Sequence, residues 1–357
     1  MSFRDLELAK NLVADIKQLH PSHRTVICHV CGTHEWTVTH FGLRSLLPDL
    51  VEVIAGPGCP VCVLPAADID VAVELARKGV TITTFGDVLR VPGSHSSLAE
   101  AKAEGGDVRV VYSIQNAATM ARKEPNRDFA FFAIGFETTA PLTANEILKA
   151  PPNLSFLSSH RLIPPAMEFL LGVGDLQIDG FIAPGHVSTI IGLDPYRVFA
   201  DAYHMPVVVA GFEPIDVLFA IDMILRQTHE GEARLENEYN RAVKPEGNLK
   251  ALDLMAQVFD VVQGGWRGLG KLPQSALSIK DEFIERDAHQ KHQVTKKKGR
   301  DFLPGCQCHL VMMGKIKPSE CPLFMEACTP SEPRGACMVS TEGTCRIWAL
   351  HGGSGLQ

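Results

Sequence analysis

A turn rich in glycine, proline and cysteine places the strongest constraint on how this chain can fold. The apolar segment 51–54 has the β-branched character of a buried strand, and the turn 56–62, Gly-Pro-Gly-Cys-Pro-Val-Cys, follows it. The two glycines let another part of the molecule approach the main chain closely, and the two prolines stiffen the turn. The thiols of Cys59 and Cys62 can bind one metal or each other, and thiols in such a motif are commonly reactive. Two buried structural cysteines are the plainer alternative.

Short apolar segments alternate with helical segments up to about residue 230, which is typical of α/β domains with mainly parallel sheets. Many of the conspicuous polar residues follow directly after a predicted strand. Ligands of open α/β sheets bind beyond the carboxyl ends of the strands, so two such domains facing each other would surround one cleft with these side chains. They are Cys31, His34, Cys59, Cys62, Glu137, Thr138, His186 and Glu213.

We therefore predict an α/β fold with two Rossmann-like, open parallel-sheet domains that face a central cleft, and a third, mostly helical or loop domain. Residues 1–20 should form an amphipathic helix that packs on the third domain. The two α/β domains are predicted at 21–124 and 125–230, and the third domain at 231–357. The glycine-rich segment 262–270 lacks the lysine of a phosphate-binding loop and is predicted to be a turn.

The ten cysteines are unevenly distributed, which predicts two separate thiol sites. Four lie before residue 63, and the other six are Cys306, Cys308, Cys321, Cys328, Cys337 and Cys345. Most of these six cysteines are separated by wide segments that contain proline and glycine, whereas structural zinc sites usually have closely spaced cysteine pairs. The spacing therefore favours a [4Fe–4S] cluster over zinc, and over redox-active disulfides without a metal. It does not show which four of the six thiols would be ligands.

Charge and hydropathy limit the classes of partner. The formal net charge of −7 argues against a nucleic-acid-binding surface, and the basic segment 291–300 is predicted to be a solvated loop. The amino-terminal segment lacks the apolar core of a signal peptide, and no stretch approaches the roughly 18 apolar residues of a membrane span. We therefore expect a cytoplasmic protein with no nucleic-acid or membrane partner.

Five motifs, in this order, resemble those of the HypD family of [NiFe]-hydrogenase maturation proteins, and the resemblance covers essentially the whole chain. They are CGTHE at 31–35, GPGCPVC at 56–62, GFETTAP at 135–141, PGHVS at 184–188 and CMVSTEGTC at 337–345. The resemblance implies two α/β domains and a third domain that holds a [4Fe–4S] cluster. It also implies a function that spacing does not reveal, the assembly of the Fe(CN)2CO unit of the hydrogenase active site.

The resemblance implies partners as well. A HypC-type chaperone would share the assembly, a HypE-type protein would donate cyanide, and the hydrogenase large subunit would receive the finished unit. Cys308 and Cys337 would form a dithiol or disulfide pair near the cluster. The cluster ligands, carried over by motif, would be Cys306, Cys321, Cys328 and Cys345.

At the front of the chain, the resemblance implies that Cys31 binds the iron of the Fe(CN)2CO unit together with a cysteine of the chaperone. His34 and Glu35 would tune the pKa of Cys31 or take its proton. Cys59 and Cys62 would form a redox dithiol or help to hold the iron.

The remaining candidates, Glu137, Thr138 and His186, would line the cleft and hydrogen-bond cyanide or the CO precursor. A different class of function stays open, because a stand-alone thiol–disulfide oxidoreductase fed by an iron–sulfur cluster would need only Cys59 and Cys62. The scaffold, in contrast, needs Cys31 as an iron ligand. An iron–sulfur lyase or dehydratase is a weaker third alternative, since it requires an open iron and four ligands are at hand.

Overall fold

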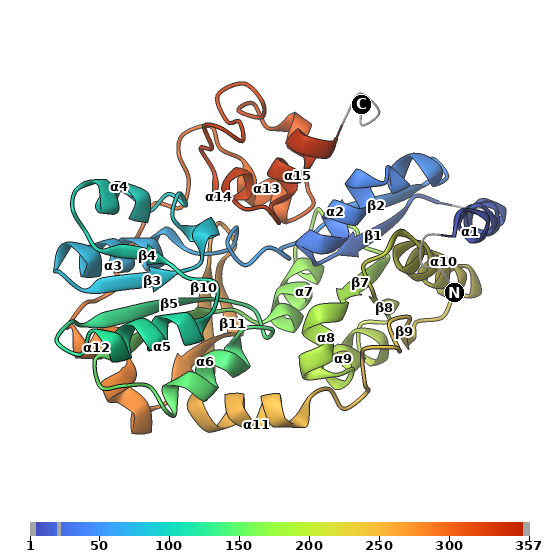
Figure 1. The fold of residues 1–357 in the computed structure, drawn as a ribbon. Helices are drawn as coiled ribbons and strands as arrows, with labels where there is room; N and C mark the ends of the chain where they lie inside the picture. Colours follow the sequence, from blue (N-terminus) through green and yellow to red (C-terminus); the bar gives the residue numbers. More distant parts are fainter. Residues whose placement is uncertain (1–4, 20–22, 353–357) are drawn as a thin grey trace.

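The computed structural model of this chain describes residues 5–19 and 23–352. Two parallel sheets, an antiparallel hairpin and a carboxy-terminal lobe make up the fold (Figure 1). The predicted α/β class with two open parallel sheets is therefore confirmed.

The first sheet has five parallel strands in the order β2–β1–β7–β8–β9. They are β1 (Thr25–His29), β2 (Val51–Ala55), β7 (Gly180–Pro184), β8 (Val207–Ala210) and β9 (Leu235–Asn237). Its helices are α1 (Leu6–Gln18), α2 (Gly32–His40), α8 (Gly185–Ile191), α9 (Arg197–Asp201) and α10 (Pro214–Glu230). The three central strands are buried along their whole length, as expected for a parallel sheet covered on both faces.

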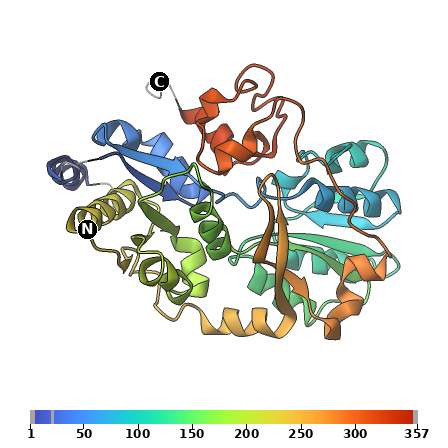
Figure 2. The ribbon, with the colours of Figure 1, turned by 180° about the vertical axis from the view of Figure 1, so that it is seen from behind.

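The second sheet has four parallel strands in the order β4–β3–β5–β6. They are β3 (Thr81–Thr84), β4 (Val108–Val110), β5 (Phe129–Gly135) and β6 (Leu154–His160). Its helices are α3 (Ala66–Arg77), α4 (Leu98–Ala103), α5 (Ile114–Lys123), α6 (Ala140–Ile147), α7 (Ile163–Leu171) and α11 (Leu249–Val258). The hairpin of β10 (Phe259–Trp266) and β11 (Gly270–Ile279), brown in the view from behind, packs against β6 and α7 (Figure 2).

The carboxy-terminal lobe, red in Figure 1, lies over the junction of the two sheet units and is built mainly from loops. The last helices are α12 (Ala288–Lys291), α13 (Cys308–Met312), α14 (Ala336–Val339) and α15 (Thr344–His351). Short 3₁₀ segments are η1 (Leu43–Leu46), η2 (Gly86–Val88), η3 (Asp194–Tyr196), η4 (Asp281–Arg286) and η5 (Pro318–Glu320). Among the helices of the described ranges, none has the length and hydropathy needed to cross a bilayer.

The strands do not divide between the sheets at the predicted boundaries. Segment 21–124 gives β1 and β2 to the first sheet but β3 and β4 to the second, and segment 125–230 gives strands to both. Strand β9, from segment 231–357, completes the first sheet. The chain leaves the first sheet after β2 and returns when β7 pairs with β1. An apolar pattern shows where a strand lies, but it does not show which strand will be its neighbour.

Helix α1 packs against α10 of the first sheet unit, and not on the third domain as predicted. Leu12 and Ile16 are buried in a cluster with Ile27 of β1 and Ile221 of α10. The amphipathic pattern indicates that one face of the helix is buried, but it carries no information about the partner. Residues 1–4 and 20 of the predicted segment lie outside the described residues.

The basic segment 291–300 is mostly an exposed loop, as predicted, and two of its residues also anchor it to the second sheet unit. Lys296 Nζ lies 2.6 Å from a carboxylate oxygen of the buried Asp68, and the Arg300 N–H donates to Ser94 Oγ. The segment therefore fastens the carboxy-terminal lobe to the neighbourhood of helix α3.

The loops that follow β1 and β2 lie directly against each other. The Gly32 N–H donates to the Gly58 carbonyl oxygen over 3.2 Å. A Cβ at Gly58 would lie 2.1 Å from the Val30 carbonyl carbon and 2.2 Å from the Cys31 nitrogen, which no side chain could tolerate. Glycine is therefore required where the CxxC turn rests on the main chain that carries Cys31.

Candidate functional site

A cavity of about 480 Å³ lies where the two sheet units and the carboxy-terminal lobe meet. The loop after β1 contributes Cys31 to its wall, and α8, which directly follows β7, contributes His186. The loops after β3 and β5 contribute Phe85 and Thr138. Glu342 lines it from the lobe. The carboxyl ends of both sheets therefore face one central cleft, as the sequence predicts.

Cys31 lies between this cavity and a second, much smaller one. It is the N-cap residue of α2 and lines both cavities. The small cavity, of about 10 Å³, has room for about one water molecule, and Cys59, Cys62 and Cys337 also line it. Burial raises the pKa of the Cys31 thiol to about 11, although backbone N–H groups at the start of α2 act in the opposite direction. Four cysteines from three distant parts of the chain thus meet at one point.

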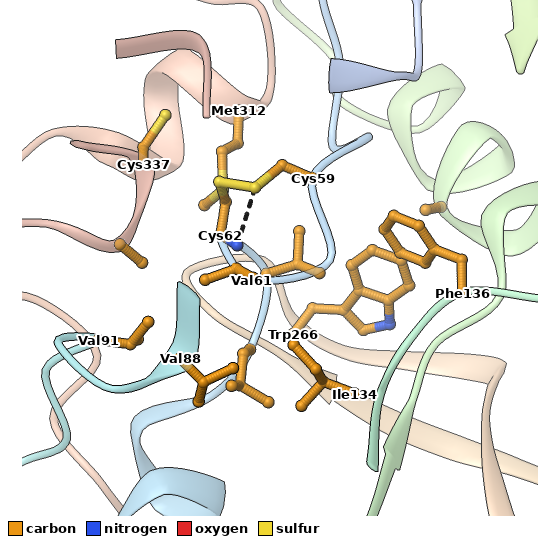
Figure 3. Close-up of a cluster of buried hydrophobic side chains, with 14 of the residues drawn as sticks. Cys59, Val61, Cys62, Val88, Val91, Ile134, Phe136, Trp266, Met312 and Cys337 are labelled. Carbon is orange, nitrogen blue, oxygen red and sulfur yellow. Dashed lines mark hydrogen bonds between the residues drawn. A yellow bond between two sulfur atoms is a disulfide. The ribbon is translucent and has the colours of Figure 1, made fainter. Parts of the chain in front are cut away.

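The two cysteines of the CxxC turn form a disulfide. The Cys62 N–H donates to Cys59 Sγ over 3.1 Å, and Val61 between them is buried in the core. Figure 3 shows the disulfide beside Met312, with Cys337 projecting from the neighbouring lobe. The turn therefore places both thiols within reach of each other, and their redox role stays a prediction.

Three rings form a stack that runs from the core to the large cavity. The ring centroids of His34 and Phe212 are 4.9 Å apart, and those of Phe212 and His186 are 3.9 Å apart. His34 Nε2 donates to the Gly211 carbonyl oxygen over 2.8 Å, while Nδ1 has no hydrogen-bond partner among the described residues. Burial lowers the pKa of His34 to about 3, so its ring is neutral. His186 is the exposed end of the stack and lines the cavity.

Glu137 and Thr138 both follow β5, but of these two only Thr138 lines the large cavity. Glu137 is buried behind it, and its Oε1 accepts the Ile163 N–H over 2.9 Å. Its Oε2 has no hydrogen-bond partner within the described part of the chain. Burial raises the pKa of Glu137 to about 7, so this carboxyl group is partly protonated near neutral pH.

Glu35 is fully buried, and four side chains occupy its carboxylate. Oε1 accepts from Thr39 Oγ1 (2.5 Å), Arg44 Nη1 (3.0 Å) and Trp348 Nε1 (2.7 Å). Oε2 accepts from His29 Nε2 (2.8 Å) and Arg44 Nη2 (2.7 Å). Burial alone would raise the pKa of Glu35, but Arg44 and His29 outweigh it and hold this pKa well below its usual range. The geometry therefore favours a structural role, in which Glu35 ties α2 to α15, over the predicted transfer of a proton from Cys31.

The six carboxy-terminal cysteines are all buried in the lobe, and none of them forms a disulfide. Cys306 Sγ and Cys308 Sγ are 3.3 Å apart. Contacts with the thiols of Cys308 and Cys345 lower the pKa of Cys337, and the Cys345 N–H donates to Cys337 Sγ over 3.2 Å. The predicted pair Cys308 and Cys337 is therefore in contact, but so are thiols from the predicted ligand set.

These residues fit an iron–sulfur cluster by their chemistry. Backbone N–H groups donate to sulfur, as the Arg334 N–H does to Cys328 Sγ over 3.3 Å, and such bonds are usual at cluster thiolates. Gly335 leaves room for the sulfurs, because a Cβ there would lie 2.5 Å from Cys308 Sγ and 3.0 Å from Cys306 Sγ. Within the described ranges, no three His, Cys, Asp or Glu side chains are arranged to hold a single metal ion. The structure thus gathers the thiols without selecting four ligands.

Sequence reasoning missed two residues of the site. Phe212 links the two histidines, and the only available signal was its place in a short motif after β8. Glu342 belongs to the motif at 337–345 and lines both cavities, but no role was assigned to it. The burial of Glu35 could not be foreseen, since one of its partners, Trp348, lies 313 positions away.

The buried carboxylate of Glu35 makes a testable contribution to stability. We expect Glu35→Gln to lower the free energy of unfolding by roughly 3–5 kcal/mol at pH 7, because Arg44 loses its buried partner. The folded-state pKa of Glu35 is lowered, so its contribution is present above about pH 4.5, the ordinary value, and is lost as the pH falls below it. Urea unfolding of both proteins between pH 7 and pH 3 should show the difference narrowing below about pH 4.5.

A matched control is Glu104→Gln, which removes one partner of the exposed pair with Arg77 and should change stability little. A difference between wild type and Glu35→Gln that stays constant down to pH 3 would contradict the assignment.

Comparison with known proteins connects this geometry to a family. The HypD family model, described as "Hydrogenase formation hypA family", matches residues 7–352. A putative hydrogenase expression/formation protein of Methanocaldococcus jannaschii is 47% identical over 353 residues, which are 98% of each chain. The hydrogenase maturation factors HypD of Azotobacter vinelandii and Cupriavidus necator are 44% and 43% identical, over 98% of this chain and 96% of their own. The resemblance carried by the five motifs is confirmed, and the chain belongs to the HypD family of hydrogenase maturation factors.

Proposed function

We propose that this hydrogenase maturation factor is a scaffold on which the Fe(CN)2CO unit of the [NiFe]-hydrogenase active site is assembled, together with a HypC-type chaperone. The observation that supports this proposal is the position of Cys31. It is a free thiol at the boundary between a cavity of about 480 Å³ and a small cavity lined by three other cysteines. One side of Cys31 is open to a bound ligand, and the other side reaches thiols that can exchange electrons.

Iron that carries cyanide and CO is a soft metal centre, so a thiolate suits it. The raised pKa of Cys31 means that iron must displace the thiol proton, which the charge of the metal makes possible. A cysteine of the chaperone would supply a second thiolate. His186 and Thr138, on the wall of the same cavity, can donate hydrogen bonds to the nitrogen of cyanide or to the CO precursor.

The carboxy-terminal thiols are proposed to hold a [4Fe–4S] cluster. Such a cluster supplies single electrons when it is bound. The fit rests on the burial of these cysteines, on the backbone donors to sulfur and on their collection in one lobe. The proposed ligands are Cys306, Cys321, Cys328 and Cys345.

Cys308 and Cys337 are proposed to pass electrons to the CxxC turn by thiol–disulfide exchange. Cys337 contacts Cys308 and lines the small cavity together with the disulfide. The Cys337 thiolate would attack the Cys59–Cys62 disulfide, and one of these two sulfurs would leave as a thiolate. The Cys308 thiolate would then attack Cys337, which releases Cys59 and Cys62 as a dithiol and leaves Cys308 and Cys337 as a disulfide.

A HypE-type cyanide donor and, indirectly, the hydrogenase large subunit complete the proposed set of partners. A cytoplasmic location stays a prediction from the sequence. The alternative function, a stand-alone thiol–disulfide oxidoreductase, is favoured by the disulfide of the CxxC turn. It gives no role to Cys31 or to the large cavity, so we favour the scaffold.

The scaffold proposal predicts that Cys31 is required for one iron beyond the cluster. Complexes with the HypC-type chaperone would be purified anaerobically, and their iron would be measured by elemental analysis and Mössbauer spectroscopy. Wild type should carry an iron that Cys31→Ala lacks. Cys28→Ala is the matched control, since Cys28 is buried in β1 and lines neither cavity. Retention of that iron in Cys31→Ala would contradict the scaffold.

The exchange proposal predicts the behaviour of two further variants. Cys308→Ser and Cys337→Ser should keep the visible absorption of the cluster. When a one-electron donor reduces the cluster, the Cys59–Cys62 disulfide should stay intact in Cys337→Ser, while Cys308→Ser should stop at the mixed disulfide with Cys337, so neither variant should form the dithiol. Alkylation followed by mass spectrometry would count the free thiols of the turn. Loss of the cluster in either variant would mean that the ligand set is a different one. Reduction of the disulfide at the wild-type rate in both variants would contradict the exchange.

A further inference from the structure

A buried arginine joins the two thiol sites, and the proposed function gives it no role. Arg267 lies in the glycine-rich segment that follows β10, and its side chain is 1% exposed. Its guanidinium donates to three backbone carbonyl oxygens, those of Leu64 (Nε, 2.5 Å), Asp301 (Nη1, 2.5 Å) and Pro92 (Nη2, 2.8 Å). A rigid five-donor fork suits such a junction better than a lysine ammonium would.

The three carbonyl oxygens belong to segments that lead into both thiol sites. Leu64 is two residues beyond Cys62, and the Arg267 N–H also donates to the Val63 carbonyl oxygen over 2.8 Å. Asp301 is five residues before Cys306. Its carboxylate accepts the Ala66 N–H at the start of α3 over 2.9 Å. The junction therefore fixes the CxxC turn relative to the segment that carries the first cysteines of the lobe.

The neighbouring glycine packs the main chain beside Arg267 against α13, the helix that begins at Cys308. Gly268 has φ of +74°, and a Cβ there would lie 2.3 Å from Phe302 Cζ and 2.5 Å from His309 Cβ. His309 directly follows Cys308 in α13. The main chain at Arg267 is thus packed against the helix on which Cys308 lies.

The charge of Arg267 is incompletely balanced. Its three side-chain hydrogen bonds go to carbonyl groups, while the Asp301 carboxylate is occupied by the Ala66 and Gly268 N–H groups. Burial lowers the pKa of Arg267, whereas Asp301 and the thiols of Cys308 and Cys306 favour its charged form. The guanidinium is thus a buried cation bonded to the Asp301 carbonyl oxygen, at the base of the segment that carries the first cysteines of the lobe, where salt screens little.

We propose that Arg267 is a positioning residue that raises the reduction potential of the carboxy-terminal cluster by holding a fixed positive charge at the junction of the segments that carry Cys306 and Cys308. The inference rests on the proposed function, because it needs a cluster in this lobe. One electron from an external donor enters the cluster on reduction, and the site gains one negative charge. A fixed cation stabilises that state more than the oxidised one, so the potential is higher than it would be without Arg267.

The test is a redox titration of the reconstituted full-length protein, followed by electron paramagnetic resonance of the reduced cluster. Arg267→Gln removes the charge and keeps a hydrogen-bonding group, and we expect a shift to more negative potential. The shift should correspond to about a tenfold change in the ratio of oxidised to reduced cluster at a fixed potential, or about 59 mV for one electron. Arg267→Lys keeps the charge and should titrate close to wild type.

Arg161→Gln is the matched control for loss of a buried guanidinium. Arg161 donates to the Gly265 carbonyl oxygen and to Asp68. Its replacement in Arg161→Gln should leave the reduction potential of the cluster unchanged. Equal potentials for wild type and Arg267→Gln would overturn the inference and leave the proposed function intact. If Arg267→Gln does not fold, Arg267→Lys tests the proposal instead. This variant keeps the positive charge, so a reduction potential well below that of wild type in Arg267→Lys would contradict a role for the charge. A wild-type protein that binds no cluster would overturn both proposals.

Discussion

The close contact of Gly58 with the loop after β1 is the constraint on which the site depends. The CxxC turn lies on the main chain at Val30 and Cys31, where no Cβ could fit, and the Gly32 N–H holds it there. This contact places Cys31 beside the disulfide of the turn. Packing of α15 on α2, with Trp348 bonded to Glu35, brings the carboxy-terminal lobe over the same point and adds Cys337. The thiols therefore come together through backbone packing between three segments of the chain, and no single sequence motif includes all of these cysteines.

The buried ionisable groups of the site differ in their hydrogen-bond partners, and these partners decide the role of each group more than burial does. Glu35 is surrounded by donors that stabilise its charge, so it acts as a structural anion. Glu137 has one bonded oxygen and one without a partner among the described residues, and burial raises its pKa. His34 is bonded through one nitrogen and is neutral. Arg267 donates to three carbonyl groups, and burial lowers its pKa.

Local features of the sequence predicted much of this arrangement. The apolar segment 51–54 identified strand β2, and residues that follow it line the cleft, because the carboxyl ends of parallel strands share one edge. The local sequence pattern could not show which strands share a sheet, because β7 pairs with β1 although more than a hundred residues separate them in the chain. The partner of α1 was missed for the same reason. The partners of Glu35 could not be predicted from its sequence neighbours, since Arg44 and Trp348 reach it only in the folded chain.

The central claim is that this chain carries an iron fragment with cyanide and CO ligands on its scaffold. Infrared spectroscopy of the anaerobically purified complex with the HypC-type chaperone tests this most directly, because the stretching bands of metal-bound cyanide and CO lie in a region free of protein absorption. The account predicts both kinds of band in the wild-type complex and their loss in Cys31→Ala. A wild-type complex with an intact iron–sulfur cluster but without either band would contradict it, and would favour the thiol–disulfide oxidoreductase.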